Sequence, residues 1–330
     1  MQSKILPCCA FTPLGQKKKH ITREEIHLRI KKGETVFPWK AEFKEESREY
    51  PSHLELLEKY DIPYIIDIHS HFFPEIVMKL IWRWFDSVQW GIAYRYSVDR
   101  CIEYLKRNRV YFYTTLNYAH KSNMAEWLND WIFSNSKNWK GAIPFGTFYP
   151  EKGVLSYVRK AVEEYGLRGF KLHCEVSKLD LNRTELEDTF YYLEEKQIPI
   201  VIHSGHAPLP GEFTGIEYFS RFMKKFKNLS VIVAHMGAYE ISDYAALLDI
   251  YPNLKLDTTM VFVDFLATGE DTDEFLPILD RYSEKILFGS DFPNIPYVLS
   301  HPIRKLLEAP LSRVTKKNIF YKNAMNLFSL

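Results

Sequence analysis

Histidines close several short apolar runs of this sequence, where their imidazole nitrogens could bind a metal ion. His69 and His71 alternate in the segment DIHSH, and side chains two apart on a strand point to the same side. His203 closes the run IPIVIH and His235 closes LSVIVAH, whereas Asp291 follows KILFGS. Imidazoles together with one carboxylate are ligands that suit zinc and related divalent ions. The pattern therefore predicts a catalytic metal site.

Asp291 and His235 are the candidate catalytic residues of that site. A divalent ion lowers the pKa of a bound water towards ~7 and polarises a carbonyl oxygen. Asp291 could accept the proton of that water and then deliver it to a leaving group. We expect His235 to orient the nucleophile or to stabilise a developing oxyanion.

Two further histidines are candidates for substrate binding. His173 ends the run GFKLH, and His206 follows Gly205 in the loop after His203, where it would face substrate or solvent. For each of the two, the alternative is a structural histidine whose ring is satisfied by the backbone.

The elements that must position these residues repeat along the chain. Eight apolar, β-branched runs alternate with segments of helical spacing, which is typical of parallel strands buried on both faces. Such strand–helix units predict an α/β fold, a (β/α)8 TIM barrel with its chemistry at the carboxyl ends of the strands. A doubly wound open sheet is the alternative, but no glycine-rich phosphate turn follows the first run. The runs are Tyr64–Ile68, Val110–Leu116, Gly141–Gly146, Gly169–Leu172, Ile198–Ile202, Leu229–Ala234, Leu254–Asp257 and Lys285–Gly289.

Two segments lie outside the regular pattern. Residues 1–60 carry mixed charge blocks and predict an N-terminal extension, with a last helix at His53–Tyr60 before a barrel domain over residues 61–330. The aromatic segment 72–98 predicts a helix and a lid inserted after the first strand. Its aromatic side chains either line a pocket or pack the lid on the barrel; they are Trp82, Trp84, Trp90 and Tyr94.

Composition narrows the class of protein further. The 330 residues carry 43 basic and 42 acidic side chains, and this net charge of +1 argues against nucleic-acid binding. No apolar run approaches the ~20 residues of a membrane span. The spacing of the four cysteines predicts neither a disulfide framework nor a cysteine-based zinc site, and we expect a cytoplasmic protein acting on a small molecule.

The motifs together resemble those of the amidohydrolase superfamily of metal-dependent barrels. The similarity is to its amidohydrolase 2 branch, which includes the enzymes that resemble aminocarboxymuconate-semialdehyde decarboxylase. It covers roughly residues 61–330, and DIHSH and GSDFP are its most specific parts. The other parts are GFKLH, PIVIHSG, VIVAHMG and NIFYKNAMNLF.

The resemblance implies a role for each of these residues. It implies His69, His71, His203 and Asp291 as metal ligands and His235 as the catalytic histidine. It also implies one metal ion, usually zinc, with Lys171 as a substrate-binding pocket residue, and it implies a homodimer. The alternative is a dinuclear site bridged by a carbamylated Lys171.

Three functions follow from this resemblance. The first is a metal-dependent hydrolase, in which an activated water attacks an amide, ester or lactone of a small molecule. The second is a non-oxidative decarboxylase of a small carboxylated substrate, with Asp291 or His235 handling the proton. The third is a metal-binding barrel that has lost catalysis, although no ligand of the pattern is missing.

Overall fold

The eight predicted runs all form strands in the computed structural model of the protein. The structure describes residues 52–87, 90–207, 211–263 and 272–330. Its strands are β1 Ile65–Asp67, β2 Val110–Thr114, β3 Ala142–Ile143, β4 Phe145–Gly146, β5 Gly169–His173, β6 Ile200–His203, β7 Val231–Val233, β8 Leu254–Asp257 and β9 Ile286–Leu287. Pro144 divides the third run into β3 and β4, because proline has no N–H to donate to a neighbouring strand.

All strand pairs are parallel, and they form two ladders, β1-β2-β3 and β4-β5-β6-β7-β8-β9. Backbone hydrogen bonds also join the last strand region to the first. The N–H of Ile68 donates to Phe288 O at 3.0 Å, and the N–H of Asp291 donates to His69 O at 2.8 Å. The strands therefore follow one another around a TIM barrel, as predicted.

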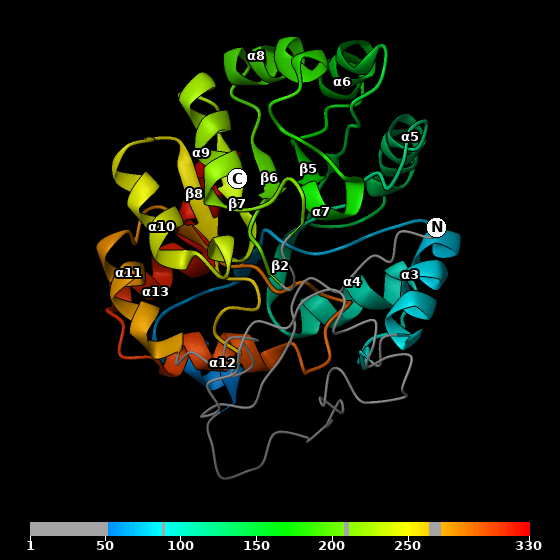
Figure 1. Ribbon diagram of the computed structural model, residues 1–330. Coiled ribbons are helices and arrows are strands. Elements are labelled where there is room, and N and C mark those ends of the chain that lie inside the picture. Colours follow the sequence, from blue (N-terminus) through cyan, green and yellow to red (C-terminus); the bar gives the residue numbers. More distant parts are fainter. Residues whose placement is uncertain (1–51, 88–89, 208–210, 264–271) are drawn as a thin grey trace.

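Helices surround the strands, as Figure 1 shows. The segments VLSYVRKAVEEYG, TELEDTFYYLEEKQ, IEYFSRFMKKFK and DEFLPILDRY are helical as predicted. The helices are α2 His53–Lys59, α3 Glu75–Ser87, α4 Val98–Arg107, α5 Ala125–Ser136, α6 Val154–Glu163, α7 Cys174–Ser177, α8 Glu187–Glu195, α9 Ile216–Lys225, α10 Ile241–Ala246, α11 Leu276–Arg281, α12 Ser300–Glu308, α13 Arg313–Lys317 and α14 Asn323–Phe328. Shorter helical segments are η1 Thr184–Leu186, η2 Ala234–Gly237, η3 Leu247–Asp249, η4 Thr272–Phe275 and η5 Asn318–Lys322.

Strand side chains alternate between two buried clusters. In β6, Ile200 and Ile202 pack in the large cluster that includes residues of the surrounding helices, while Val201 packs in a smaller cluster with Ile232 and Phe328. This smaller cluster fills the barrel interior. Because residues two apart share a side, the strand that buries Val201 inside also directs His203 inwards.

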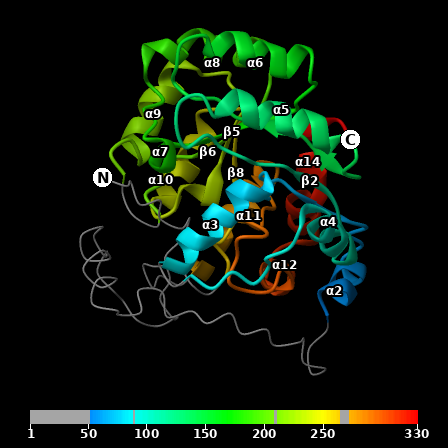
Figure 2. The same ribbon diagram turned by 90° about the vertical axis from the view of Figure 1, so that its right-hand side faces the viewer.

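The irregular regions also take helical form. The predicted helix at residues 53–60 is α2, which begins with a capping box between Ser52 and Glu55 and buries Leu56 and Leu57 in the core. The rest of the predicted extension, residues 1–51, lies outside the described residues. The insertion after β1 forms α3, which lies on the outside of the strands in Figure 2. None of the helices described here combines the length and apolarity needed to cross a bilayer.

Candidate metal centre

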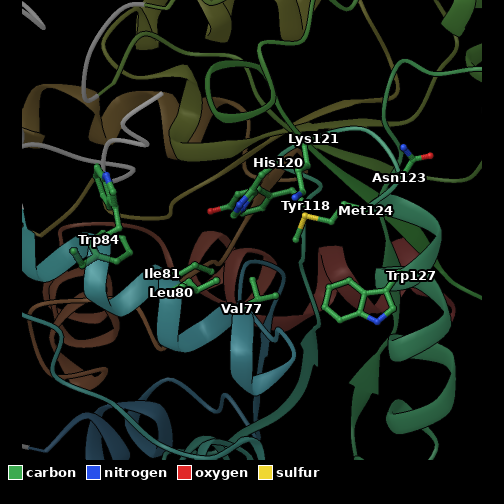
Figure 3. A pocket seen from close by; sticks show the side chains of 11 residues that line it. Val77, Leu80, Ile81, Trp84, Tyr118, His120, Lys121, Asn123, Met124 and Trp127 are labelled. Carbon is green, nitrogen blue, oxygen red and sulfur yellow. The ribbon is translucent and has the colours of Figure 1, made fainter. Parts of the chain in front are cut away.

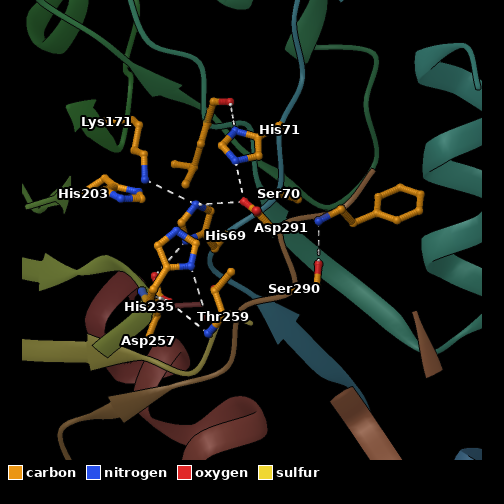
Figure 4. Close-up of polar contacts among 12 residues, drawn as sticks. His69, Ser70, His71, Lys171, His203, His235, Asp257, Thr259, Ser290 and Asp291 are labelled. Carbon is orange, nitrogen blue, oxygen red and sulfur yellow. Dashed lines mark hydrogen bonds and ion pairs between the residues drawn. The ribbon is translucent and has the colours of Figure 1, made fainter. Parts of the chain in front are cut away.

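Three predicted ligands converge where the first and last strands meet. His69, His71 and Asp291 each offer one ligand atom, and these atoms lie within 4.8 Å of one another (Figure 4). All three side chains are buried. The sequence separates His71 from Asp291 by 220 positions, so the backbone bonds between the first and last strand regions bring them together.

The hydrogen bonds of His71 direct one ring nitrogen at Asp291. Its Nδ1 lies 3.1 Å from the carbonyl oxygen of Leu116, which can only accept, so Nδ1 carries a proton. Its Nε2 lies 2.7 Å from Oδ1 of Asp291. A neutral imidazole would then point a lone pair at a carboxylate, so a cation is needed between them, either a second proton or a metal ion.

A hydrogen bond from Nδ1 also orients the ring of His69, but here the acceptor is a carboxylate. Its Nδ1 lies 2.9 Å from Oδ2 of Asp257, so Nδ1 donates and Nε2 carries the lone pair. That Nε2 lies 3.4 Å from Oδ1 of Asp291. Burial lowers the pKa of His69 well below its usual value, and the charge of Lys171 lowers it further, which favours the neutral imidazole that binds metals.

Asp291 owes its position to an uncommon backbone conformation. Its φ is 68°, in the left-handed region that aspartate tolerates better than most residues. Burial alone would raise the pKa of its carboxyl, but the hydrogen bond from His71 and the nearby histidine charges hold that pKa well below its usual range. Asp291 therefore stays ionised, as a metal ligand must.

His235 faces the same centre from the end of β7. Its ring centroid lies 4.9 Å from that of His69, and its Nδ1 lies 3.1 Å from Thr259 O. That carbonyl fixes the proton on Nδ1, so Nε2 carries the lone pair. Burial, together with the smaller effect of the charge of His69, lowers the pKa of His235 to about 4. The predicted catalytic histidine is therefore neutral near pH 7.

His203 lies next to this centre but not within the group of three. Its ring packs 4.7 Å from that of His235 and stacks 4.0 Å from that of His173. Its Nε2 contacts Ala207 O at 3.0 Å, whereas Nδ1 is buried without a hydrogen-bond partner among the described residues. His203 remains a predicted ligand, with Nδ1 as the nitrogen that could bind.

The structure places the three predicted substrate-binding residues at different depths. Lys171 is buried, and its Nζ lies 3.2 Å from Nε2 of His69, inside the centre. His173 accepts the N–H of Val176 at 3.3 Å, a structural contact at the start of α7. His206 lies further away, where its Nδ1 is 3.0 Å from Thr214 Oγ1. Of these predicted substrate-binding residues, Lys171 is the one with a hydrogen-bond contact to the candidate ligands, through His69, among the contacts of the described residues.

Two buried carboxylates belong to the site but were not predicted from the sequence. Asp257 binds His69 and accepts the backbone N–H groups of His235 and Thr259 at 2.9 and 3.0 Å. Asp67 accepts the N–H of His69 at 3.0 Å, and burial raises the pKa of Asp67 to about 7. Asp67 begins DIHSH, a segment that already marked the site, whereas Asp257 ends LKLD, where the sequence predicts no site residue.

The donor set fits a divalent metal ion. Two histidines direct Nε2 at one ionised carboxylate, and each of their Nδ1 atoms contacts a fixed acceptor. Metal-binding histidines almost always donate their second nitrogen to a carboxylate or a carbonyl in this way. The site therefore contains both the ligands and the partners that orient them.

The comparison with protein families decides which family this is. A family model described as amidohydrolase matches residues 66–330. The chain belongs to the amidohydrolase family. The predicted resemblance is thereby confirmed, and with it the metal-dependent character of the family. No curated protein matches the chain.

Solved structures of amidohydrolase-like barrels share this fold. An uncharacterized TIM-barrel protein from Bordetella bronchiseptica is 16% identical, with a TM-score of 0.65 over 81% of this chain and 98% of that chain. A dihydroxybenzoic acid decarboxylase from a Polaromonas species, with bound manganese and 2-nitroresorcinol, is 16% identical, with a TM-score of 0.60 over 81% and 97%. A 4-oxalomesaconate hydratase from Rhodopseudomonas palustris is 17% identical, with a TM-score of 0.56 over 80% and 95%.

Proposed function

We propose that the protein is a metal-dependent decarboxylase that removes carbon dioxide from a small carboxylated substrate without oxidation. The observation that carries this choice is the buried amine of Lys171 at the centre. Its Nζ lies 3.2 Å from Nε2 of His69, beside the predicted metal ligands. A lysine amine next to a divalent ion would favour an anionic carboxylate over a neutral amide. Decarboxylases among the structures of this fold support the same choice.

The metal would be held by His69, His71 and Asp291, with Nδ1 of His203 as the fourth predicted donor. When bound, a divalent ion supplies Lewis-acid polarisation of substrate oxygens. We propose a single zinc ion, because neutral imidazoles with one carboxylate suit zinc. The manganese in the Polaromonas structure makes manganese the alternative to test.

The protein's own residues would bind the substrate and handle one proton. Lys171 is placed to bind a substrate carboxylate at its Nζ, and the burial of the centre excludes water. The bond to the carboxyl carbon breaks, the carboxylate leaves as carbon dioxide, and the electron pair stays on the substrate carbon. A proton must replace the carboxylate on that carbon. Asp291, which is ionised, or Nε2 of His235, which carries a lone pair, would first take this proton from solvent and then deliver it to the carbon.

Hydrolysis is the second candidate, and one specific contact favours it. Nζ of Lys171, which lies within β5, is 3.2 Å from Nε2 of His69, a proposed metal ligand. A carbamylated lysine at this point would hold a second metal ion, which is a hydrolytic arrangement in the superfamily. Mass measurement of the intact protein distinguishes the two states, because carbamylation adds the mass of one carbon dioxide.

Metal analysis tests the proposal first. Purified protein should hold one divalent ion per chain after incubation with zinc or manganese, and Asp291→Asn should hold much less. A panel of aromatic carboxylates, amides and lactones should then release carbon dioxide from a carboxylate only. Hydrolysis of a neutral amide or lactone without carbon dioxide release would make the second candidate correct. A protein without stoichiometric metal under replete conditions would contradict both.

A further inference from the structure

An apolar pocket lies one side chain away from the metal centre. It has a volume of about 480 Å³ and lies between α3 and the segment 118–127 (Figure 3). An engineered apolar cavity of about 150 Å³ is large enough for benzene. This pocket therefore has room for a group larger than one aromatic ring. Its apolar lining includes Val77, Leu80, Ile81, Phe85, Met124 and Trp127.

Tyr118 contacts both this pocket and His71 of the metal centre. It lines the pocket, and its ring centroid lies 5.7 Å from that of His71 and 5.1 Å from that of His173. A molecule in the pocket would thus contact the tyrosine that contacts a metal ligand. The pocket and the centre are neighbouring parts of one binding region.

Two buried polar atoms belong to residues that line this apolar space. Nε2 of His120 and Nε1 of Trp84 have no hydrogen-bond partner within the described part of the chain. Burial lowers the pKa of His120 to about 4, so its ring is neutral near pH 7. Buried polar atoms without partners are costly, and a single polar atom on an otherwise apolar ligand could satisfy one of them.

We propose that this pocket binds an apolar tail of the substrate, while the carboxylate of the same molecule binds at the metal centre. The substrate class is thus an amphiphilic carboxylic acid whose tail passes Tyr118 and is larger than one ring. This inference rests on the proposed function, because it places the carboxylate at the metal. Leu80 and Trp127, 57% and 45% exposed, form the outer edge by which the tail would enter.

Straight-chain carboxylates test the inference by binding alone. We would titrate acetate, butanoate, hexanoate and octanoate into the metal-loaded protein by calorimetry. Affinity should rise up to about fourfold for each added methylene, because each one leaves water for the pocket. A flat series from acetate to octanoate would overturn the inference. It would leave the proposed function intact, since metal content and carbon dioxide release are measured separately.

A matched pair of variants locates the tail. Leu80→Glu places a charge at the pocket edge, and Ile76→Glu places the same charge one turn earlier on α3, at an exposed residue that does not line the pocket. Leu80→Glu should remove most of the gain from acetate to octanoate, while Ile76→Glu should keep it. Val77→Trp, which fills the pocket with a larger side chain, should also remove most of the rise in affinity from acetate to octanoate. The inference would be overturned if all three variants showed the same rise in affinity from acetate to octanoate. It would also be overturned if this rise persisted after the metal had been removed by a chelator.

Discussion

Nδ1 of His69 lies 2.9 Å from Oδ2 of Asp257, while Oδ1 of that carboxylate accepts the N–H groups of His235 and Thr259. One carboxylate at the end of β8 therefore orients His69, a predicted metal ligand, and also fixes the backbone of His235, the predicted catalytic histidine. Because both of its oxygens are already bound, its orientation is set, and so is the tautomer of His69.

Asp257→Asn should weaken metal binding by about 10- to 100-fold. The amide oxygen of the asparagine would stay with the two backbone N–H groups, so its NH2 group would face His69. Nδ1 of His69 would then have to accept, which puts the proton on Nε2, where the metal should bind. Competition with a chelator measures the loss. Asp249→Asn, at an exposed ion pair with Arg281, is the control and should bind metal as the wild type does.

His235→Asn should keep its metal and lose turnover by about 100- to 10,000-fold, as expected for removal of a general acid or base. The reason is that His235 is held by Thr259 O and lies beside, not within, the group of three ligands. Metal analysis and steady-state rates on the same preparation check both parts. If the variant loses its metal, His235 is a ligand and its assigned role is wrong.

Gly289→Ala should weaken both folding and metal binding. A β-carbon at this position would lie 2.1 Å from Oγ1 of Thr259 and 2.7 Å from Cβ of His69, so these residues would have to move. We expect a loss of about 1–3 kcal/mol in the free energy of unfolding, measured in urea. Gly153→Ala is the control, because its φ of 83° is strained for alanine but no atom lies within 4 Å. That variant should lose stability and keep its metal affinity.

His120 should make stability depend on pH. Burial lowers its pKa from 6.5 to about 4 in the folded protein, so the unfolded chain binds the proton more readily. Its contribution is present above pH 6.5 and is lost as the pH falls towards 4, by up to about 3 kcal/mol. Urea unfolding between pH 4 and 7 should give a flatter profile for His120→Gln than for the wild type at the same metal content. Parallel profiles would show that His120 is not buried as a neutral ring.

The eight strand segments could be predicted because most of them are buried on both faces and read as short apolar runs. The histidines at the ends of these runs could be identified as site candidates because a polar side chain there follows an otherwise apolar pattern. His69, His71 and Asp291 were predicted together and lie together.

Asp257 could not be identified from the sequence, because an aspartate at a strand end has many ordinary uses. Its role depends on His69, which follows β1, coming to lie beside the end of β8, although the two residues are 188 positions apart. The different surroundings of His173 and His206 depend on the same kind of long-range packing. The sequence pattern alone therefore does not predict which of these two histidines lies closer to the metal centre.

The bonds that join the first strand region to the last also decide when the metal centre can form during synthesis. His71 leaves the ribosome 220 residues before Asp291 does, and Gly289 and Asp291 belong to the final segment that pairs with residues 68–71. A growing chain therefore carries His69 and His71, the two histidines of the predicted site, long before Asp291 can complete that site. A chain that stops at residue 284 should bind no stoichiometric zinc, so loading with metal would be a signature of a finished polypeptide.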